Sequence, residues 1–332
     1  MNASIEVART TGTTAGVFRY LADTVRPSLY RTGEVLIRRN VDGSDSGMQG
    51  VDLSACECAV YDARRNTGNA RCTLEKNGFE LLPRGIEGDR VDFFDHAEVV
   101  ERYYGDCVRI VEEATGARAF AFDHNVRSAG GKQEGARIRG GQQVQGPAHV
   151  VHGDYTLTSA PQRLRDLTRP PGVNDTVRTL LAEGQSLIAP VLAARALAAG
   201  ARFAIINVWR NIADVPVATH PLALCDAQTV LPDDLVVFEI HYQDRIGENY
   251  FARHVPRHRW YYYPAMTRDE ALLIKQWDSA GALARSEGRL GDASDATAPC
   301  TFSFHSAFED PSTPPDAPDR WSIEVRCMVI YD

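Results

Sequence analysis

Short strand-like segments dominate the second half of the chain, and they limit the folds it can adopt more than any other feature. Each combines apolar, β-branched or aromatic residues, and turn residues separate one from the next. They lie at 149–156, 202–210, 235–243, 249–255, 259–264, 301–308 and 321–331. Many short strands with turn signals between them are typical of β-sandwiches and jelly-roll barrels. We therefore predict a mainly β protein with flanking helices and a double-stranded β-helix (jelly-roll) core over residues 147–331.

The first 128 residues predict a mixed α/β layer with a helical component, packed outside this core. Apolar residues at helical spacing indicate a helix over 96–117, and Gly116 is suited to end it. Further helices are predicted at 18–25, 176–184, 190–200 and 268–279, and strands at 57–64, 77–83 and 117–127. No repeat or linker divides the chain, so we expect a single domain over residues 1–332.

The stretch GGKQEGARIRGGQQVQG, residues 130–146, stands apart from both regions. It is rich in glycine and glutamine and contains few residues that could enter a core. Such composition is typical of a surface loop. We predict a flexible loop here that does not pack against the domain.

Charge and cysteine content exclude several classes of partner. The net charge is −8, which disfavours nucleic acid or an anionic membrane as the main partner. No run of 18 apolar residues and no apolar leader segment occurs. The 7 cysteines are odd in number and lack a paired zinc-knuckle spacing, so we expect reduced thiols. These features favour a cytoplasmic protein acting on a small molecule. The oligomeric state stays open, with a homodimer as one option.

The octapeptide HVVHGDYT, residues 149–156, suggests a metal site. Residues two apart share a face of a strand, so His152 and Asp154 point the same way and His149 points oppositely. An imidazole and a carboxylate in parallel can bind one ion, and a distant histidine would complete a two-histidine, one-carboxylate site with open positions. By itself the HxD pattern is a weak signal, because it also occurs on surface strands.

Two histidines compete for the third position. His305 lies on a predicted strand directly before the final strand, and His258 precedes the aromatic run RWYYYP. In barrels of this kind the last ligand comes from the strand next to the cation-bearing final strand. That position favours His305, with His258 as the alternative.

The final strand carries Arg320, Ser322, Glu324 and Arg326 on one face by alternation. A buried arginine needs an anionic partner, and its planar group suits a carboxylate. Arg320 and Ser322 are therefore predicted to bind the carboxylate of a co-substrate, with Arg326 as the alternative anchor. A structural ion-pair ladder with Glu324 is the competing interpretation.

Taken together, the motifs resemble the hydroxylase/desaturase family of secondary metabolism. This family includes gibberellin-desaturase-like, aspirochlorine-pathway and cephalosporin-7-hydroxylase-type proteins. The resemblance rests on 60–83, 115–127, 149–156, NVWR at 207–210, 221–230, 258–279, 304–311 and 320–326. Two departures are Gly153, where valine is more usual, and the 130–146 segment.

The resemblance implies an Fe(II)- and 2-oxoglutarate-dependent dioxygenase that hydroxylates or desaturates a small secondary metabolite with O2. It implies that His152, Asp154 and His305 bind the iron and that Arg320, helped by Ser322, binds the oxoacid. A rearrangement or isomerisation on the same iron is one alternative. A cupin-like metal protein without redox chemistry is another.

Several further residues are candidates for lining the site. Arg210 could grip the oxoacid or the substrate, or pair with Asp214 or Asp226. The other substrate candidates are Tyr155, Asn207, Trp209, His124 and His258, with Arg127 and Arg163 as weaker ones.

Overall fold

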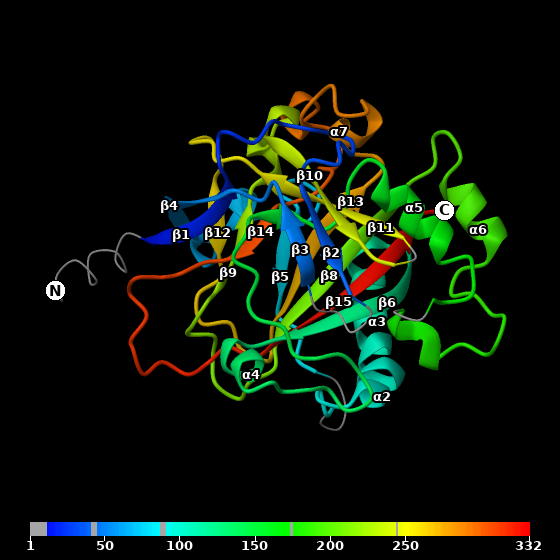
Figure 1. The fold of residues 1–332 in the computed structure, drawn as a ribbon, viewed down its shortest axis with the longest axis horizontal. Helices are drawn as coiled ribbons and strands as arrows, with labels where there is room; N and C mark the ends of the chain where they lie inside the picture. Colours follow the sequence, from blue (N-terminus) through cyan, green and yellow to red (C-terminus); the bar gives the residue numbers. More distant parts are fainter. Residues whose placement is uncertain (1–11, 41–44, 87–90, 173–174, 244) are drawn as a thin grey trace.

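Two β-sheets face each other in the computed structural model, which describes residues 12–40, 45–86, 91–172, 175–243 and 245–332. Over these residues, the larger sheet has 10 strands in the order β1-β4-β12-β9-β14-β7-β11-β10-β2-β3, and the smaller has 5 in the order β5-β13-β8-β15-β6. Figure 1 shows the helices gathered outside these sheets. The predicted β-rich fold with flanking helices is confirmed.

The larger sheet draws its strands from both halves of the chain. Its members are β1 (Thr13–Leu21), β2 (Leu36–Arg39), β3 (Asp45–Gln49), β4 (Leu53–Asp62), β7 (His152–Gly153), β9 (Leu222–Cys225), β10 (Leu235–His241), β11 (Ile246–Ala252), β12 (Trp260–Tyr262) and β14 (His305–Ala307). On its open side β1 also bridges Val150, Arg253 and Glu309. These bridges bring the first strand back to the strands that carry the predicted ligands.

The smaller sheet contains β5 (Phe79–Leu82), β6 (Arg118–Arg127), β8 (Phe203–Asn211), β13 (Ala271–Asp278) and β15 (Ser322–Ile330). Its central strands β8 and β13 are buried along their whole length. β6 lies at its edge and pairs with β15. The first 128 residues therefore contribute strands to both sheets and do not form a separate layer.

One continuous helical run, the predicted 96–117 helix, covers the outer face of the smaller sheet. It consists of α2 (His96–Glu98), a π-helical turn (Val99–Tyr103) and α3 (Tyr104–Thr115), and contacts β6, β8 and β15. Gly116 ends it in the left-handed conformation with φ 65°, as expected. Figure 1 shows this run beside β6 and β15.

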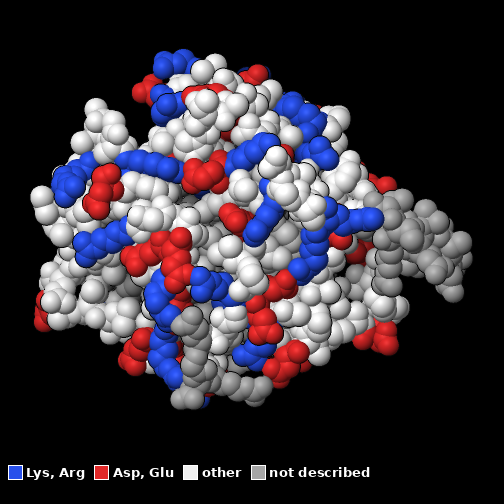
Figure 2. Space-filling model, turned by 180° about the vertical axis from the view of Figure 1, so that it is seen from behind, with Lys and Arg blue, Asp and Glu red and all other residues white. Residues whose placement is uncertain are grey.

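The remaining helices are short. They are α4 (Ala129–Gln133), α5 (Ser159–Asp166), α6 (Pro190–Ala196) and α7 (Ala282–Arg285). Within the described ranges, no helix has the length and apolar character needed to cross a membrane. Figure 2 shows basic and acidic side chains interspersed on the face seen from behind.

Three predicted helices are wrong. Residues 18–25 begin in β1, where Phe18 and Tyr20 alternate into the core at 0% exposure and β4 pairs alongside. Residues 268–279 form β13, whose pairing with β5 and β8 overrides local helix preference. Residues 176–184 contain only a 3₁₀ turn, Thr176–Thr179.

The 130–146 segment packs against the domain, contrary to expectation. Ile138 and Val144 are 4% and 1% exposed and belong to the main core. The backbone of Gln145 pairs with Val126 and Ser128. Two apolar side chains and these backbone bonds outweigh the polar composition that suggested a free loop.

Candidate metal centre

His152, Asp154 and His305 come together between the two sheets. His152 lies on β7 and pairs with His305, the first residue of β14. The Nε2 atoms of His152 and His305 lie 3.7 Å and 4.0 Å from Asp154 Oδ1. Candidate ligand atoms of all three residues lie within 4.8 Å of one another. The structure thus brings together the predicted set, in the spacing that one ion requires.

Backbone contacts prepare the His152 imidazole for metal binding. Its Nδ1 lies 2.7 Å from the carbonyl oxygen of Val150, so Nδ1 carries the proton and donates. Nε2 is then left with a free lone pair toward the cluster. Burial, aided by the neighbouring His305, lowers the pKa of His152 to about 4. Burial also lowers the pKa of His305, so both rings are neutral near pH 7, as a ligand must be.

The other side of the Asp154 carboxylate is held by the smaller sheet. Oδ2 accepts hydrogen bonds from Arg326 Nε at 3.0 Å and from Asn207 Nδ2 at 3.1 Å. Burial by itself would raise the pKa of Asp154, but Arg326 and the two histidines hold it well below its usual value. Asp154 therefore stays ionised, with Oδ1 directed at the imidazoles.

Gln276 is a site residue that sequence reasoning missed. Its Oε1 accepts from the Asp154 backbone N–H at 3.0 Å, and its Nε2 lies 3.5 Å from His305 Nδ1. It is fully buried and sits at a β-bulge, where the pairing of β13 with β8 skips from Lys275 to Trp277. Bulges re-aim side chains, often beside active sites. The mistaken helix assignment for 268–279 concealed this position.

Arg320 and Ser322 form a buried polar cradle near the start of β15. Arg320 is 2% and Ser322 1% exposed, and Arg320 Nε and Ser322 Oγ have no hydrogen-bond partner among the described residues. The Arg320 guanidinium donates to the His220 carbonyl and lies 5.8 Å from the Trp209 ring centroid. Burial, then Arg127, lowers the pKa of Arg320 to about 9. Buried N–H and O–H groups without a partner are suited to binding the carboxylate of a ligand.

Arg326 has a different environment from Arg320. Besides Asp154, it pairs with Asp123 at 3.0 Å and with Glu324 at 3.3 Å. Its donors are engaged by protein carboxylates. The ion-pair ladder weighed for this strand therefore exists at Arg326 and not at Arg320.

Arg210 lies outside the site, contrary to expectation. On β8 it pairs with Ile323, and it bonds to the Tyr103 hydroxyl at 3.0 Å and the Arg268 carbonyl at 2.6 Å. Asn207 and Trp209 point to the opposite face, toward Asp154 and Arg320. Strand alternation places Arg210 on the face of β8 away from the metal cluster, where protein groups occupy its guanidinium.

His258 is also removed from the cluster. It is buried between the Tyr20 hydroxyl and the Asp234 carboxylate, each 3.2 Å from a ring nitrogen. The structure thus brings His305, and not His258, to the cluster, and His258 lies in the core. His149 faces His220 with ring centroids 5.0 Å apart, as its opposite parity suggested.

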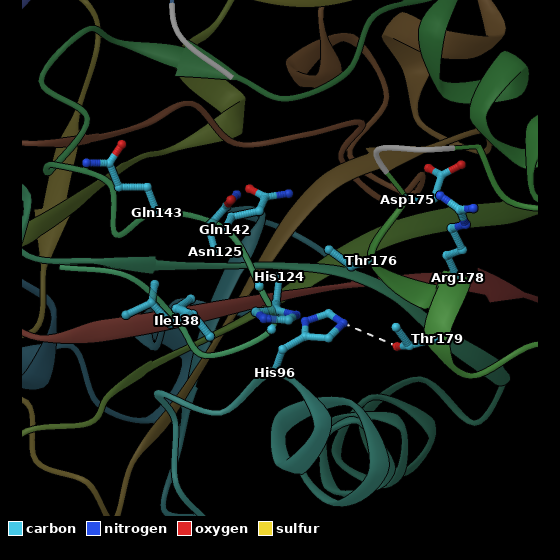
Figure 3. Close-up of a pocket in the computed structure, with 13 residues that line it drawn as sticks. His96, His124, Asn125, Ile138, Gln142, Gln143, Asp175, Thr176, Arg178 and Thr179 are labelled. Carbon is cyan, nitrogen blue, oxygen red and sulfur yellow. Dashed lines mark hydrogen bonds between the residues drawn. The ribbon is translucent and has the colours of Figure 1, made fainter. Parts of the chain in front are cut away.

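A cavity of about 260 Å³ lies at the edge strand β6, shown in Figure 3. His124 lines it and bonds to the Tyr104 hydroxyl at 2.9 Å, and His96 stacks on it at 5.3 Å. Residues 138–143 and 175–179 complete much of its wall.

Tyr155 is half-buried and packs on the main core. Of the substrate candidates, His124 thus lines this cavity, while Asn207 adjoins the metal cluster.

Gly153 is explained by packing. A Cβ there would lie 3.0 Å from Phe302 Cδ2 and 3.1 Å from Cε2, which is tighter than ordinary contact. The ring of Phe302 fills the space that the usual valine would occupy. The group that approaches this glycine most closely is therefore a core side chain.

The chain matches the family described as Oxidoreductase/YMDC permease-like domain over residues 35–330. An uncharacterised protein of Methylophilus leisingeri is 38% identical over 63% of this chain and 95% of its own length. The hydroxylase/desaturase efuI of Hormonema carpetanum is 27% identical over 100% of this chain and 98% of its own. The Fe(II)/2-oxoglutarate-dependent dioxygenase nvfI of Aspergillus novofumigatus is 31% identical over 77% of each chain.

A solved structure shares the fold. The iron and alpha-ketoglutarate-dependent endoperoxidase NvfI superposes with a TM-score of 0.67, covering 96% of this chain and 98% of that one at 22% identity. The jelly-roll architecture expected from the strand pattern is therefore confirmed.

Proposed function

This chain belongs to the Oxidoreductase/YMDC permease-like domain family and is an Fe(II)/2-oxoglutarate-dependent dioxygenase, and from this premise we propose how its residues are used. His152, Asp154 and His305 bind Fe(II). Arg320 and Ser322 bind the far carboxylate of 2-oxoglutarate. The substrate is a small organic molecule, which the enzyme hydroxylates or desaturates. Bound iron and oxoacid would activate O2 for removal of a hydrogen atom from that substrate.

Two features together carry this proposal: a cluster of two neutral imidazoles and one ionised carboxylate, and buried hydrogen-bond donors without partners beside it. The cluster offers two imidazole nitrogens and one carboxylate oxygen, the donor set of facial iron sites. Arg320 Nε and Ser322 Oγ are buried and find no hydrogen-bond partner in the part of the chain that the structure describes. Zinc alone would leave these donors unexplained.

The protein's own part is to hold the ligands and keep water out. Val150 fixes the tautomer of His152, and Arg326 with Asn207 fixes the rotation of Asp154. All three ligands are at most 9% exposed. Such burial limits the access of water to the reacting centre. The seven free thiols support a cytoplasmic location for this chemistry.

An anaerobic titration tests the proposal. Fe(II) and 2-oxoglutarate should give the weak visible charge-transfer band of a chelated oxoacid in the wild type and in His258→Ala, but not in His305→Ala. A band in His305→Ala would remove His305 from the ligand set. Bound iron without a band in the wild type would instead indicate a metal protein without oxoacid chemistry. Oxygen consumption that requires 2-oxoglutarate provides the second readout.

A further inference from the structure

Arg127, Arg320 and Arg326 lie on the two strands β6 and β15 or at their ends, near the candidate metal centre. They differ in how many salt bridges they form. Arg326 pairs with all three nearby acids: Asp154, Asp123 and Glu324. Within the described residues, no carboxylate lies within 4.0 Å of the guanidinium of Arg320 or of Arg127. These two guanidinium groups therefore form no salt bridge with a described carboxylate.

Arg127 ends β6 and faces the interior between the sheets. It pairs in register with Ser322 of β15, so it lies beside the cradle proposed for the oxoacid. Its one hydrogen bond to a described residue runs from Nη1 to the Gly146 carbonyl at 3.0 Å. A guanidinium has five N–H donors, so most of its capacity is available to a ligand.

The register of β6 with β15 places Arg127 opposite Ser322, two residues from Arg320. The pKa of Arg320 agrees with this placement, because burial lowers it and the charge of Arg127 is the next largest cause. Arg127 therefore lies beside the cradle proposed for the oxoacid.

One cation suffices for the distal carboxylate of 2-oxoglutarate, and Arg320 with Ser322 supplies it. The second guanidinium, on the partly buried Arg127, forms no salt bridge with a described residue and can take a further carboxylate. Resting on the proposed function, we propose that Arg127 binds the carboxylate of the substrate, and that the substrate class is therefore small carboxylic acids.

The test compares acids with their amides in protein loaded anaerobically with Fe(II) and saturating 2-oxoglutarate. The probes are benzoate with benzamide and 1-naphthoate with 1-naphthamide, detected as perturbation of the visible band and by thermal shift. The wild type should bind each acid on the order of tenfold more tightly than its amide. Arg127→Met should lose this preference, and Arg127→Lys should keep most of it. An unchanged preference in Arg127→Met, or none in the wild type, overturns the proposal.

The affinity for 2-oxoglutarate separates this proposal from the proposed function. Arg127→Met should bind the oxoacid within about threefold of the wild type, whereas Arg320→Met should lose on the order of tenfold or more. If Arg127→Met instead loses the oxoacid band, Arg127 belongs to the co-substrate site and the substrate assignment falls. If the wild type gives no band at all, the proposed function fails before any probe is added.

Discussion

Arg326 lies 3.0 Å from Asp154 Oδ2, on the side of the carboxylate away from the histidines. The other oxygen, Oδ1, lies 3.7 Å from His152 Nε2. The two oxygens of one carboxylate thus have separate partners on opposite sheets. This division leaves a single oxygen facing the histidines, and it depends on Arg326, the residue considered as the alternative anchor for the co-substrate.

Replacing Arg326 by Met should weaken metal binding. Asp154 would lose its charged partner and could rotate, and loss of such outer-shell partners typically reduces metal affinity about 10–100-fold. Titration with Mn(II), followed by electron paramagnetic resonance, measures the change. Arg326→Lys should recover part of the affinity. Arg320→Met is the matched control and should leave Mn(II) binding intact, so an equal loss in both variants would contradict the assignment.

Replacing Gln276 by Leu should destabilise the metal-free protein. The Asp154 backbone N–H would stay buried without an acceptor, which costs about 1–3 kcal/mol in the free energy of unfolding. Urea denaturation measures this. Gln162→Leu, an exposed glutamine on α5, should change stability by less than about 0.5 kcal/mol. Equal effects of the two substitutions would show that the Gln276 bond is unimportant.

Much of the site was predictable because strand alternation is a local property. The facing of His152 and Asp154, the opposite facing of His149, and the common face of Arg320 and Ser322 follow from a period of two. The choice of His305 needed one rule about strand order. Each of these inferences depends only on residues that lie a few positions apart in the sequence, or on the order of neighbouring strands.

Other parts depend on pairing that no local pattern reveals. β13 contains helix-favouring residues, and only its neighbours β5 and β8 make it a strand. Gln276 enters the site through a bulge, which shifts the parity on which sequence reasoning relied. Arg210 ends the NVWR motif but has the opposite parity to Asn207 and Trp209, so it faces away from the cluster. In these cases contacts with neighbouring strands, and not local residue preference, determine the structure.

Acid should destabilise the metal-free protein between pH 6.5 and 4. Burial lowers the pKa of His124 to about 4, below its ordinary value near 6.5. As the pH falls, the unfolded chain takes up the proton of His124 before the folded protein does. The contribution of His124 to stability is therefore lost within this window, and it changes no further below pH 4. A shift of this size corresponds to at most about 3 kcal/mol.

His124→Gln should therefore flatten the dependence of the free energy of unfolding on pH in this window. The change is partial, because burial also lowers the pKa of His149 to about 4. Urea denaturation at pH 7.0, 5.5 and 4.5 provides the comparison. If the variant and the wild type have parallel pH dependences, His124 is not a buried neutral group.

Gly153→Ala should destabilise the protein although it leaves all three candidate ligands in place. The new Cβ would lie 3.0 Å from Phe302, a 1% exposed ring packed edge-on against Phe304. Because Phe302 cannot retreat into an already filled core, we expect a cost of about 1–3 kcal/mol from overpacking. Phe302→Leu creates space at that contact, so the double variant Gly153→Ala/Phe302→Leu should be less destabilised than the sum of the two single variants. Urea denaturation of the four proteins gives this coupling energy directly. Strict additivity would mean that Phe302 is not what excludes a side chain between the ligands, and that the glycine serves the close approach of another group.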